Sequence, residues 1–187
     1  ERQTTGTSAP AVATNYKRGS LTLENIHTTA MTFTGTADVD SSLDAYETGT
    51  WTPFFLASTT AFSSITYANN TATYTRIGDL VHIQGTLATD DITVGSASGY
   101  LLMGGLPHKS HPTYTGSLSI GFAYNWASDQ TPLTLRISNG DTTAYFDRML
   151  ANSSYVGWGS ILQYGALKDG TSSNWMQFGG TYRIKIS

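Results

Sequence analysis

The sequence predicts an all-β protein, and more specifically an antiparallel β-sandwich. Charged residues make up only 12% of the 187-residue chain, which is about half the share of an average globular protein. From residue 43 onward, short runs of β-branched and aromatic residues are separated by Gly, Asn, Asp and Pro, a spacing typical of antiparallel strands joined by turns. No stretch of this region has the apolar period of a long helix.

Residues 1–42 differ in texture from the rest of the chain. They are rich in Thr, Ser and Ala and contain only brief apolar groups, such as Met31 with Phe33. Because the segment lacks a sustained apolar period, we expect an extended linker that is ordered only against a partner surface. We expect the β-sandwich domain to occupy residues 43–187. The chain opens with Glu1 rather than Met, so we also expect a fragment or a processed product.

The clearest strand pattern lies in residues 65–87. Asn69-Asn70 and Gly78-Asp79 are pairs that tolerate a positive φ, which predicts two tight turns and hence a meander of three strands. The third of these strands alternates between a core face and an outer face. Its core face holds Val81, Ile83 and Leu87, and its outer face holds His82, Gln84 and Thr86.

Later strands show the same alternation, and each has one apolar face. The pattern places in the core Leu118, Ile120, Phe122 and Tyr124 of one strand, Leu133, Leu135 and Ile137 of the next, and Met176, Phe178, Tyr182, Ile184 and Ile186 of the last. The outer face of the last strand holds Trp175, Gln177, Thr181, Arg183 and Lys185. One-sided strands bury their apolar faces by packing as two layers, which is why we predict a sandwich.

The composition argues against several classes of partner. The formal net charge is -3 and the Lys and Arg residues are scattered singly, so no basic patch is available for nucleic acid. No run approaches the roughly 20 apolar residues of a membrane-spanning helix, so we expect no membrane insertion. The absence of cysteine excludes disulfides and thiolate metal sites.

A resemblance rests on four stretches, which occur in the order LDAYETGTWTP (43–53), ATYTRIGDLVHIQGTL (72–87), MGGLPHKS (103–110) and FGGTYRI (178–184). Together they resemble the C-terminal, distal head domain of bacteriophage tail fibres and tailspikes. The resemblance implies a jelly-roll or lectin-like sandwich, a homotrimer about the fibre axis, and a place in the virion as part of a tail fibre or a fibre-like appendage. It further implies that the N-terminal segment joins the head to other fibre or baseplate proteins.

The same resemblance implies receptor binding, or capping and trimerisation of the fibre, without a fixed set of binding residues. We therefore expect a non-catalytic protein that attaches the virus to a host surface glycan. Sugars stack their CH faces on exposed Trp or Tyr rings, while neighbouring polar side chains bind their hydroxyl groups. On this basis we predict a carbohydrate-binding site drawn from Trp126, Asp129, Tyr155, Trp158 and Trp175.

Several of these aromatic residues also have a structural interpretation. Trp126 ends a strand and is equally well explained as a ring that folds back over the core. Trp158 lies between two glycines and Trp175 lies on an outer strand face, so either ring could belong to a subunit contact. In the opening motif we interpret Tyr46 and Trp51 as packing or subunit-contact residues.

We expect no enzymatic activity, catalytic residue, cofactor or metal site. The Asp residues lie mostly in turns, where they accept hydrogen bonds from backbone NH groups, and the chain has neither a GxSxG elbow nor a Gly-rich loop that opens a helix. Residues 37–44 have Leu43 where a calcium loop needs Gly, and His108 with His111 lacks a third ligand. His82 keeps two interpretations, an exposed histidine or one of three copies that share an ion on a trimer axis.

Three other functions stay open at this point. One is a structural module that trimerises or caps a fibre, or decorates a capsid, without a receptor of its own. Another is a small polysaccharide hydrolase or lyase, and the third is a carbohydrate-binding module of a secreted enzyme. Glycan binding, release of new reducing ends and mass in solution distinguish these functions.

Overall fold

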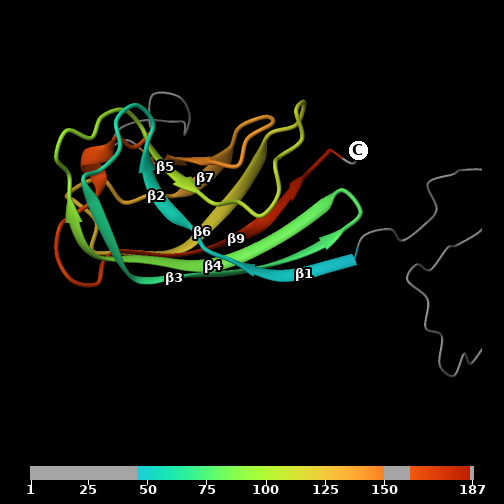
Figure 1. Ribbon diagram of the computed structural model, residues 1–187, viewed down its shortest axis with the longest axis horizontal. Helices are drawn as coiled ribbons and strands as arrows, with labels where there is room; N and C mark the ends of the chain where they lie inside the picture. The colour runs from blue at the N-terminus through green and yellow to red at the C-terminus, as the bar shows by residue number, and fades with distance from the viewer. Residues whose placement is uncertain (1–45, 150–160, 186–187) are drawn as a thin grey trace, which may run out of the picture.

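The structure is a computed structural model that describes residues 46–149 and 161–185 (Figure 1). The segment 1–42, for which we expect an extended conformation, lies outside the described residues. The described elements are β1 (Tyr46–Trp51), β2 (Phe54–Ala57), β3 (Ser64–Ile77), β4 (Leu80–Thr93), β5 (Leu101–Gly104), β6 (Gly116–Tyr124), β7 (Thr134–Ile137), β8 (Ala144–Asp147), the short 3-10 helix η2 (Tyr164–Ala166) and β9 (Ser173–Arg183). The predicted all-β class is confirmed.

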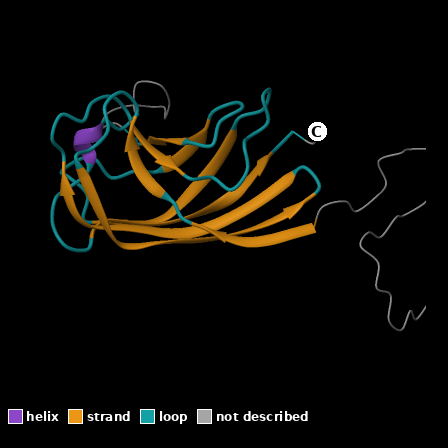
Figure 2. Cartoon of the chain, viewed as in Figure 1, coloured by secondary structure: helices purple, strands orange, loops and turns teal. Residues whose placement is uncertain are grey.

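The nine strands within the described residues belong to one antiparallel sheet with the order β1-β3-β4-β9-β6-β7-β8-β5-β2. The sheet curls over itself, so that the long strands β1, β3, β4 and β9 form one layer and the short strands β2, β5 and β7 lie above it (Figure 1). Figure 2 shows the loops gathered at the ends of these two layers. The two edge strands β1 and β2 follow one another in the chain with only Thr52 and Pro53 between them.

The core lies between the two layers and is built by alternate residues of the strands. Fully buried side chains include Val81, Ile83, Leu87, Met103, Leu118, Leu135, Ile137, Phe146 and Met176. Each such side chain contributes about 1.5–3 kcal/mol by leaving water. The predicted core faces of β4 and β9 are confirmed, including Tyr182 and Ile184, whereas Ile186 lies outside the described residues.

Two predictions about the strands are wrong. Asn69 and Asn70 do not form a turn but lie inside the 14-residue strand β3. The pairing of β3 with β4 shifts register next to Asn69, whose side-chain oxygen accepts a hydrogen bond from the backbone NH of Thr71 at 3.2 Å. A local irregularity in one strand thus replaces the first turn of the predicted meander. Leu133 also departs from the pattern, because it precedes β7 and is exposed.

The predicted phase of β6 is correct only as far as Ile120. The pairing of β6 with β9 shifts register between Ile120 and Phe122, so Gly121 is the extra residue of a β-bulge. A bulge of one residue exchanges the two faces of the strand beyond it. Phe122 and Tyr124 are therefore exposed, while Ala123 packs against the core.

The two aromatic residues of the opening motif, Tyr46 and Trp51, differ in burial. Trp51 is buried and its ring meets the edge of Phe178 at a centroid distance of 5.9 Å, which confirms a packing role. Tyr46, five residues earlier and therefore on the opposite face of β1, is exposed. Within the part of the chain that the structure describes, no helix is long and apolar enough to cross a membrane.

Candidate functional site

Three aromatic side chains gather on the outer face of the long-stranded layer, and we call Phe122, Tyr124 and Trp175 the aromatic patch. They come from β6 and β9, where Tyr124 pairs with Trp175 and Phe122 pairs with Gln177. The rings of Phe122 and Tyr124 stack at 6.4 Å with an interplanar angle of 22°, and Trp175 stands edge-on to Phe122 at 6.4 Å. Their exposed fractions are 45%, 60% and 36%, respectively.

The aromatic patch lines a hollow of about 440 Å³ together with Gln177. Exposed rings that cluster in this way leave apolar area in water, which is uncommon on a protein surface unless something binds there. The rings offer flat faces for stacking, and the amide of Gln177 offers two donors and one acceptor beside them. The arrangement suits a ligand that has both CH faces and hydroxyl groups.

Trp126 supports the aromatic patch from below. Its ring is buried, with an exposed fraction of 7%, and packs against Phe55 and Phe146 at centroid distances of 5.7 and 5.8 Å. Its indole Nε1–H donates a hydrogen bond to the carbonyl oxygen of Trp175 at 3.2 Å. Trp126 therefore matches the alternative in which a strand-end ring folds over the core, and it offers no face to a ligand.

Asp129, another predicted site residue that the structure describes, does not belong to the aromatic patch. Asp129 is exposed in the turn after Trp126 with a φ of 58°, its carbonyl oxygen accepts a hydrogen bond from Arg148, and it does not line the hollow. Tyr155 and Trp158 lie outside the described residues. Of the three predicted residues that the structure describes, Trp126, Asp129 and Trp175, only Trp175 lines the hollow.

Phe122 and Tyr124 are the site residues that the sequence pattern missed. An uninterrupted alternation through β6 assigns both rings to the core, and only the bulge turns them outward. The available signal was Gly121, because an isolated glycine within a strand pattern often marks a bulge.

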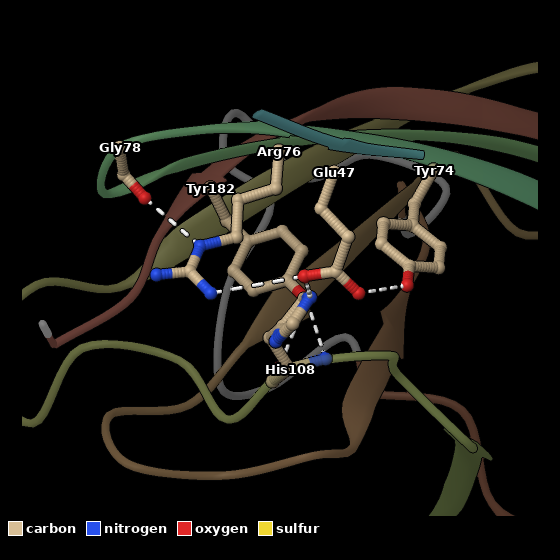
Figure 3. Close-up of polar contacts among 6 residues, drawn as sticks. All are labelled: Glu47, Tyr74, Arg76, Gly78, His108 and Tyr182. Atoms are coloured by element: carbon tan, nitrogen blue, oxygen red, sulfur yellow. Dashed lines mark hydrogen bonds and ion pairs between the residues drawn. The ribbon is translucent and has the colours of Figure 1, made fainter. Parts of the chain in front are cut away.

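A second group of side chains lies at the opposite end of the long strands, and we call Glu47, Tyr74, Arg76, His108 and Tyr182 the polar cluster (Figure 3). Tyr74 Oη–H donates a hydrogen bond to Glu47 Oε1. Glu47 Oε2 lies 3.8 Å from Arg76 Nη1 and 3.6 Å from His108 Nε2. Tyr182 Oη–H donates to the carbonyl oxygen of His108 at 2.9 Å.

The two tyrosines of the polar cluster act as donors. Burial raises the pKa of Tyr182 far above its ordinary value, although the hydrogen bond to the His108 carbonyl opposes this shift. The hydrogen bond to Glu47 raises the pKa of Tyr74. Both hydroxyl groups therefore stay protonated near neutral pH and hold their acceptors in place.

Gly49 is needed for this arrangement because the Tyr74 ring crosses directly over it. A Cβ atom at Gly49 would lie 2.6 Å from Tyr74 Cε1, which is closer than atoms pack. The sequence YETGTW thus supplies both the carboxylate of Glu47 and, at Gly49, the space that the Tyr74 ring needs in order to reach it.

Each of the four stretches that carry the family resemblance contributes to the polar cluster. Glu47 belongs to the first stretch, Tyr74 and Arg76 to the second, His108 to the third and Tyr182 to the fourth. The contacts join the edge strand β1 to β3, to the loop after β5 and to β9. The carboxylate of Glu47 is already bound by the Tyr74 phenol and the Arg76 guanidinium. We therefore assign the polar cluster a structural role, in which it holds these segments together.

Two acidic residues outside the polar cluster, Asp147 and Asp141, also have local partners. Asp147 pairs with Arg136 at 3.0 Å, and Asp141 accepts hydrogen bonds from the backbone NH groups of Thr142 and Thr143. Across residues 46–149 and 161–185, no group of three His, Asp or Glu residues could hold a metal ion. His82 is exposed on β4, with Nδ1 at 3.2 Å from Thr181 Oγ1. Comparison with models of protein families and with curated proteins gives no match for the chain.

Proposed function

We propose that this protein is the distal domain of a bacteriophage fibre and that it attaches the virion to a host surface glycan without catalysis. The observation that carries the proposal is the aromatic patch beside Gln177 on the outer face of β6 and β9. Aromatic faces stack on the CH faces of sugars, and a side-chain amide both donates to and accepts from sugar hydroxyl groups. The placement in a phage fibre rests on the resemblance of the four sequence stretches.

The state of the carboxylates supports a non-catalytic function. Glycoside hydrolysis needs two carboxyl groups that flank the scissile bond, about 5 to 10 Å apart. Near the aromatic patch, the described residues that line the hollow include no Asp or Glu. In the polar cluster, Glu47 is the one carboxylate and is bound by Tyr74 and Arg76.

A homotrimer would give weak single sites enough strength to hold a particle. The hollow beside Trp175 is shallow and open, and a shallow sugar site binds one glycan weakly. Three copies on one rigid head raise the effective concentration of the second and third contacts, so that avidity exceeds the single-site affinity by orders of magnitude. Residues 1–42 would link this head to other fibre or baseplate proteins.

The experiment that tests the proposal is a glycan array probed with the full chain, followed by titration of the glycans that bind. We expect Trp175→Ala to weaken binding by about tenfold or more, because it removes the largest of the three rings that line the hollow. Tyr114→Ala is the matched control, since Tyr114 is also an exposed aromatic residue but does not line the hollow. Equal binding by Trp175→Ala and the unaltered protein would reject the site.

A structural module that trimerises or caps the fibre is the second candidate function. Its support is an exposed apolar row on the outer face, formed by Tyr46, Ile77 and Leu80 on neighbouring strands. Such a row fits a contact between copies of the chain. A trimeric protein that binds no glycan on the array would favour this function, whereas a monomeric protein that binds glycan would indicate a carbohydrate-binding module.

A further inference from the structure

A second hollow adjoins the aromatic patch, with a volume of about 640 Å³. Its lining includes outward-pointing polar side chains of β1, β3, β4 and β9, namely Thr50, Thr71, Thr73, Gln84, Thr86 and Gln177. Between them lie Trp51, Ala72, Gly85 and Phe178, of which Trp51, Ala72 and Phe178 are buried. Gln177 lines both hollows. We infer that the two hollows form one groove that binds an extended, uncharged oligosaccharide across the strands, an inference that rests on the proposed glycan-binding function.

The register of the sheet places the groove residues in a line. Thr71 pairs with Thr86, Thr86 pairs with Gln177, and Gln177 pairs with Phe122. These four residues lie on β3, β4, β9 and β6, which are neighbours in the sheet (Figure 1). At about 4.8 Å between strands, the line spans roughly 14 Å. An aromatic ring therefore stands at one end of a line of polar side chains that is longer than one sugar ring.

A second line runs parallel to the first. Thr50 pairs with Thr73, and Thr73 pairs with Gln84. The partner of Gln84 on β9 is Gly179, which has no side chain to cover the groove at this point. The two lines together give the groove polar groups on both sides of a ligand that lies across the strands.

The chemistry of the lining selects a neutral ligand. Each Thr hydroxyl donates one hydrogen bond and accepts others, and each Gln amide offers two donors and one acceptor, which matches the mixed donor and acceptor character of sugar hydroxyl groups. Within residues 46–149 and 161–185, the lining of the two hollows includes no Lys, Arg, Asp or Glu. A sialic acid, uronic acid or sulfate placed there would lose hydration without gaining a cationic partner. The groove is therefore suited to uncharged sugars.

The lining is poorly suited to a protein partner. Centres of protein interfaces are enriched in large aromatic, Met and Arg side chains, which supply most of the binding energy. Here Thr and Gln supply the outward-pointing side chains in the middle of the groove, and the exposed rings stand at its β6 end. Trp51 and Phe178 also line the groove, but both are buried. Of the strands beneath the groove, β3, β4, β9 and β6 are already paired on both sides, so a peptide cannot add to these four as an extra strand.

The test uses the full chain on an array that contains neutral oligosaccharides of increasing length and anionic ones that bear sialate, uronate or sulfate. We expect the neutral glycans to bind, with affinity that rises with length. Thr86→Val keeps the shape of the side chain but removes its hydroxyl group, and Gln84→Ala removes an amide. Each change should weaken the longer neutral glycans about threefold to tenfold, the effect of losing one hydrogen bond. Neither should affect a monosaccharide, whereas Trp175→Ala should weaken both.

Thr48→Val is the matched control, because Thr48 is exposed on the same outer face of β1 but does not line the groove. Binding confined to anionic glycans would overturn the neutral groove but leave the proposed function intact. The same conclusion would follow if Trp175→Ala abolished binding while Thr86→Val and Gln84→Ala did not alter it. Absence of binding to every glycan would overturn both proposals. A change in solution mass on Thr86→Val would instead assign the groove to a contact between copies.

Discussion

The buried indole of Trp126 donates its Nε1–H to the backbone carbonyl of Trp175, the residue whose own ring is exposed in the aromatic patch. The buried Trp126 thus supports the backbone of Trp175, and the exposed ring of Trp175 forms part of the surface. The buried ring is packed against Phe55 and Phe146, so the position of the Trp175 backbone is fixed from the core. A rigid backbone beneath a stacking ring lowers the entropy lost when a ligand binds.

The support predicts the effect of Trp126→Phe. This change keeps an aromatic ring in the core but removes the donor to Trp175 and leaves part of the indole volume empty. We expect the free energy of unfolding to fall by about 1–3 kcal/mol, as measured by urea denaturation. Glycan affinity should fall less than in Trp175→Ala, because the exposed ring stays present. An unchanged denaturation midpoint would contradict the supporting role.

The bulge at Gly121 predicts that this residue can be deleted or substituted without turning the aromatic patch inward. Deletion makes Ile120 and Phe122 consecutive, and a regular alternation then keeps Ile120 and Ala123 inward and Phe122 and Tyr124 outward, paired with the same residues of β9 as now. We expect the deletion variant to keep its glycan affinity within about threefold, and a loss of binding would contradict this register. Gly121→Ala is the control, since nothing lies within 4 Å of a Cβ atom at this position. It should change the stability by no more than about 0.5 kcal/mol and leave the binding intact.

Gly49 allows the polar cluster to form, so Gly49→Ala should break it. The added methyl group meets the Tyr74 ring and displaces the phenol from Glu47. We expect a loss of about 1–3 kcal/mol in the free energy of unfolding, typical of an overpacked site. Gly165→Ala adds a methyl group in open space and serves as the control. Equal stability of the two variants would show that Tyr74 can move aside freely.

The raised pKa of Tyr182 predicts a loss of stability in alkali. Its ordinary pKa is 10.0, and burial raises the value in the folded protein. Above about pH 10 the unfolded chain releases this proton while the folded protein retains it, so the stability falls as the pH rises. The slope from this one group is at most about 1.4 kcal/mol per pH unit.

The measurement is urea denaturation at several pH values from neutral to strongly alkaline, for the unaltered protein and for Tyr182→Phe. The other tyrosines titrate in both proteins, so the difference between the two curves isolates Tyr182. We expect this difference in stability to shrink above about pH 10. A difference that stays constant with pH would argue against a buried, protonated phenol.

The exposed row of Tyr46, Ile77 and Leu80 predicts the residues of a subunit contact. We expect the full chain to have the mass of a trimer in solution and Ile77→Asp to shift it toward the monomer, because a charge in an apolar contact is left without a partner. Leu133→Asp places the same charge at an exposed leucine outside this row and should leave the mass unchanged. Light scattering after gel filtration measures both, and dissociation by both variants would remove the assignment to this row.

The strand pattern was readable wherever the alternation is unbroken. Val81, Ile83 and Leu87 are buried as predicted because each additional residue of a regular strand turns the side chain by half a turn. At Gly121 and beside Asn69 one irregular residue inverts or displaces the phase, and sequence periodicity alone does not show where pairing slips.

The candidate site was only partly predictable for the same reason. Trp175 follows from the phase of β9, but its neighbours Phe122 and Tyr124 depend on the bulge in β6. The polar cluster depends on contacts between segments far apart in the chain, such as Glu47 with His108. The sequence around Glu47 or His108 does not indicate which distant residue either one contacts. The resemblance does include both of the stretches that contain them, 43–53 and 103–110.

The position of the aromatic patch relative to the start of β1 determines how a tether would pull on this domain. The first described residue, Tyr46, aligns with Ile77, Leu80 and Arg183 at one end of the long strands, whereas the aromatic patch lies toward their other end. Tension between a bound glycan and the chain that precedes β1 would therefore run along the strands. The hydrogen bonds of an antiparallel ladder lie perpendicular to the strands, so β1 and β3 would be loaded in shear, with their bonds sharing the force. All the hydrogen bonds between β1 and β3 would then resist such a load together.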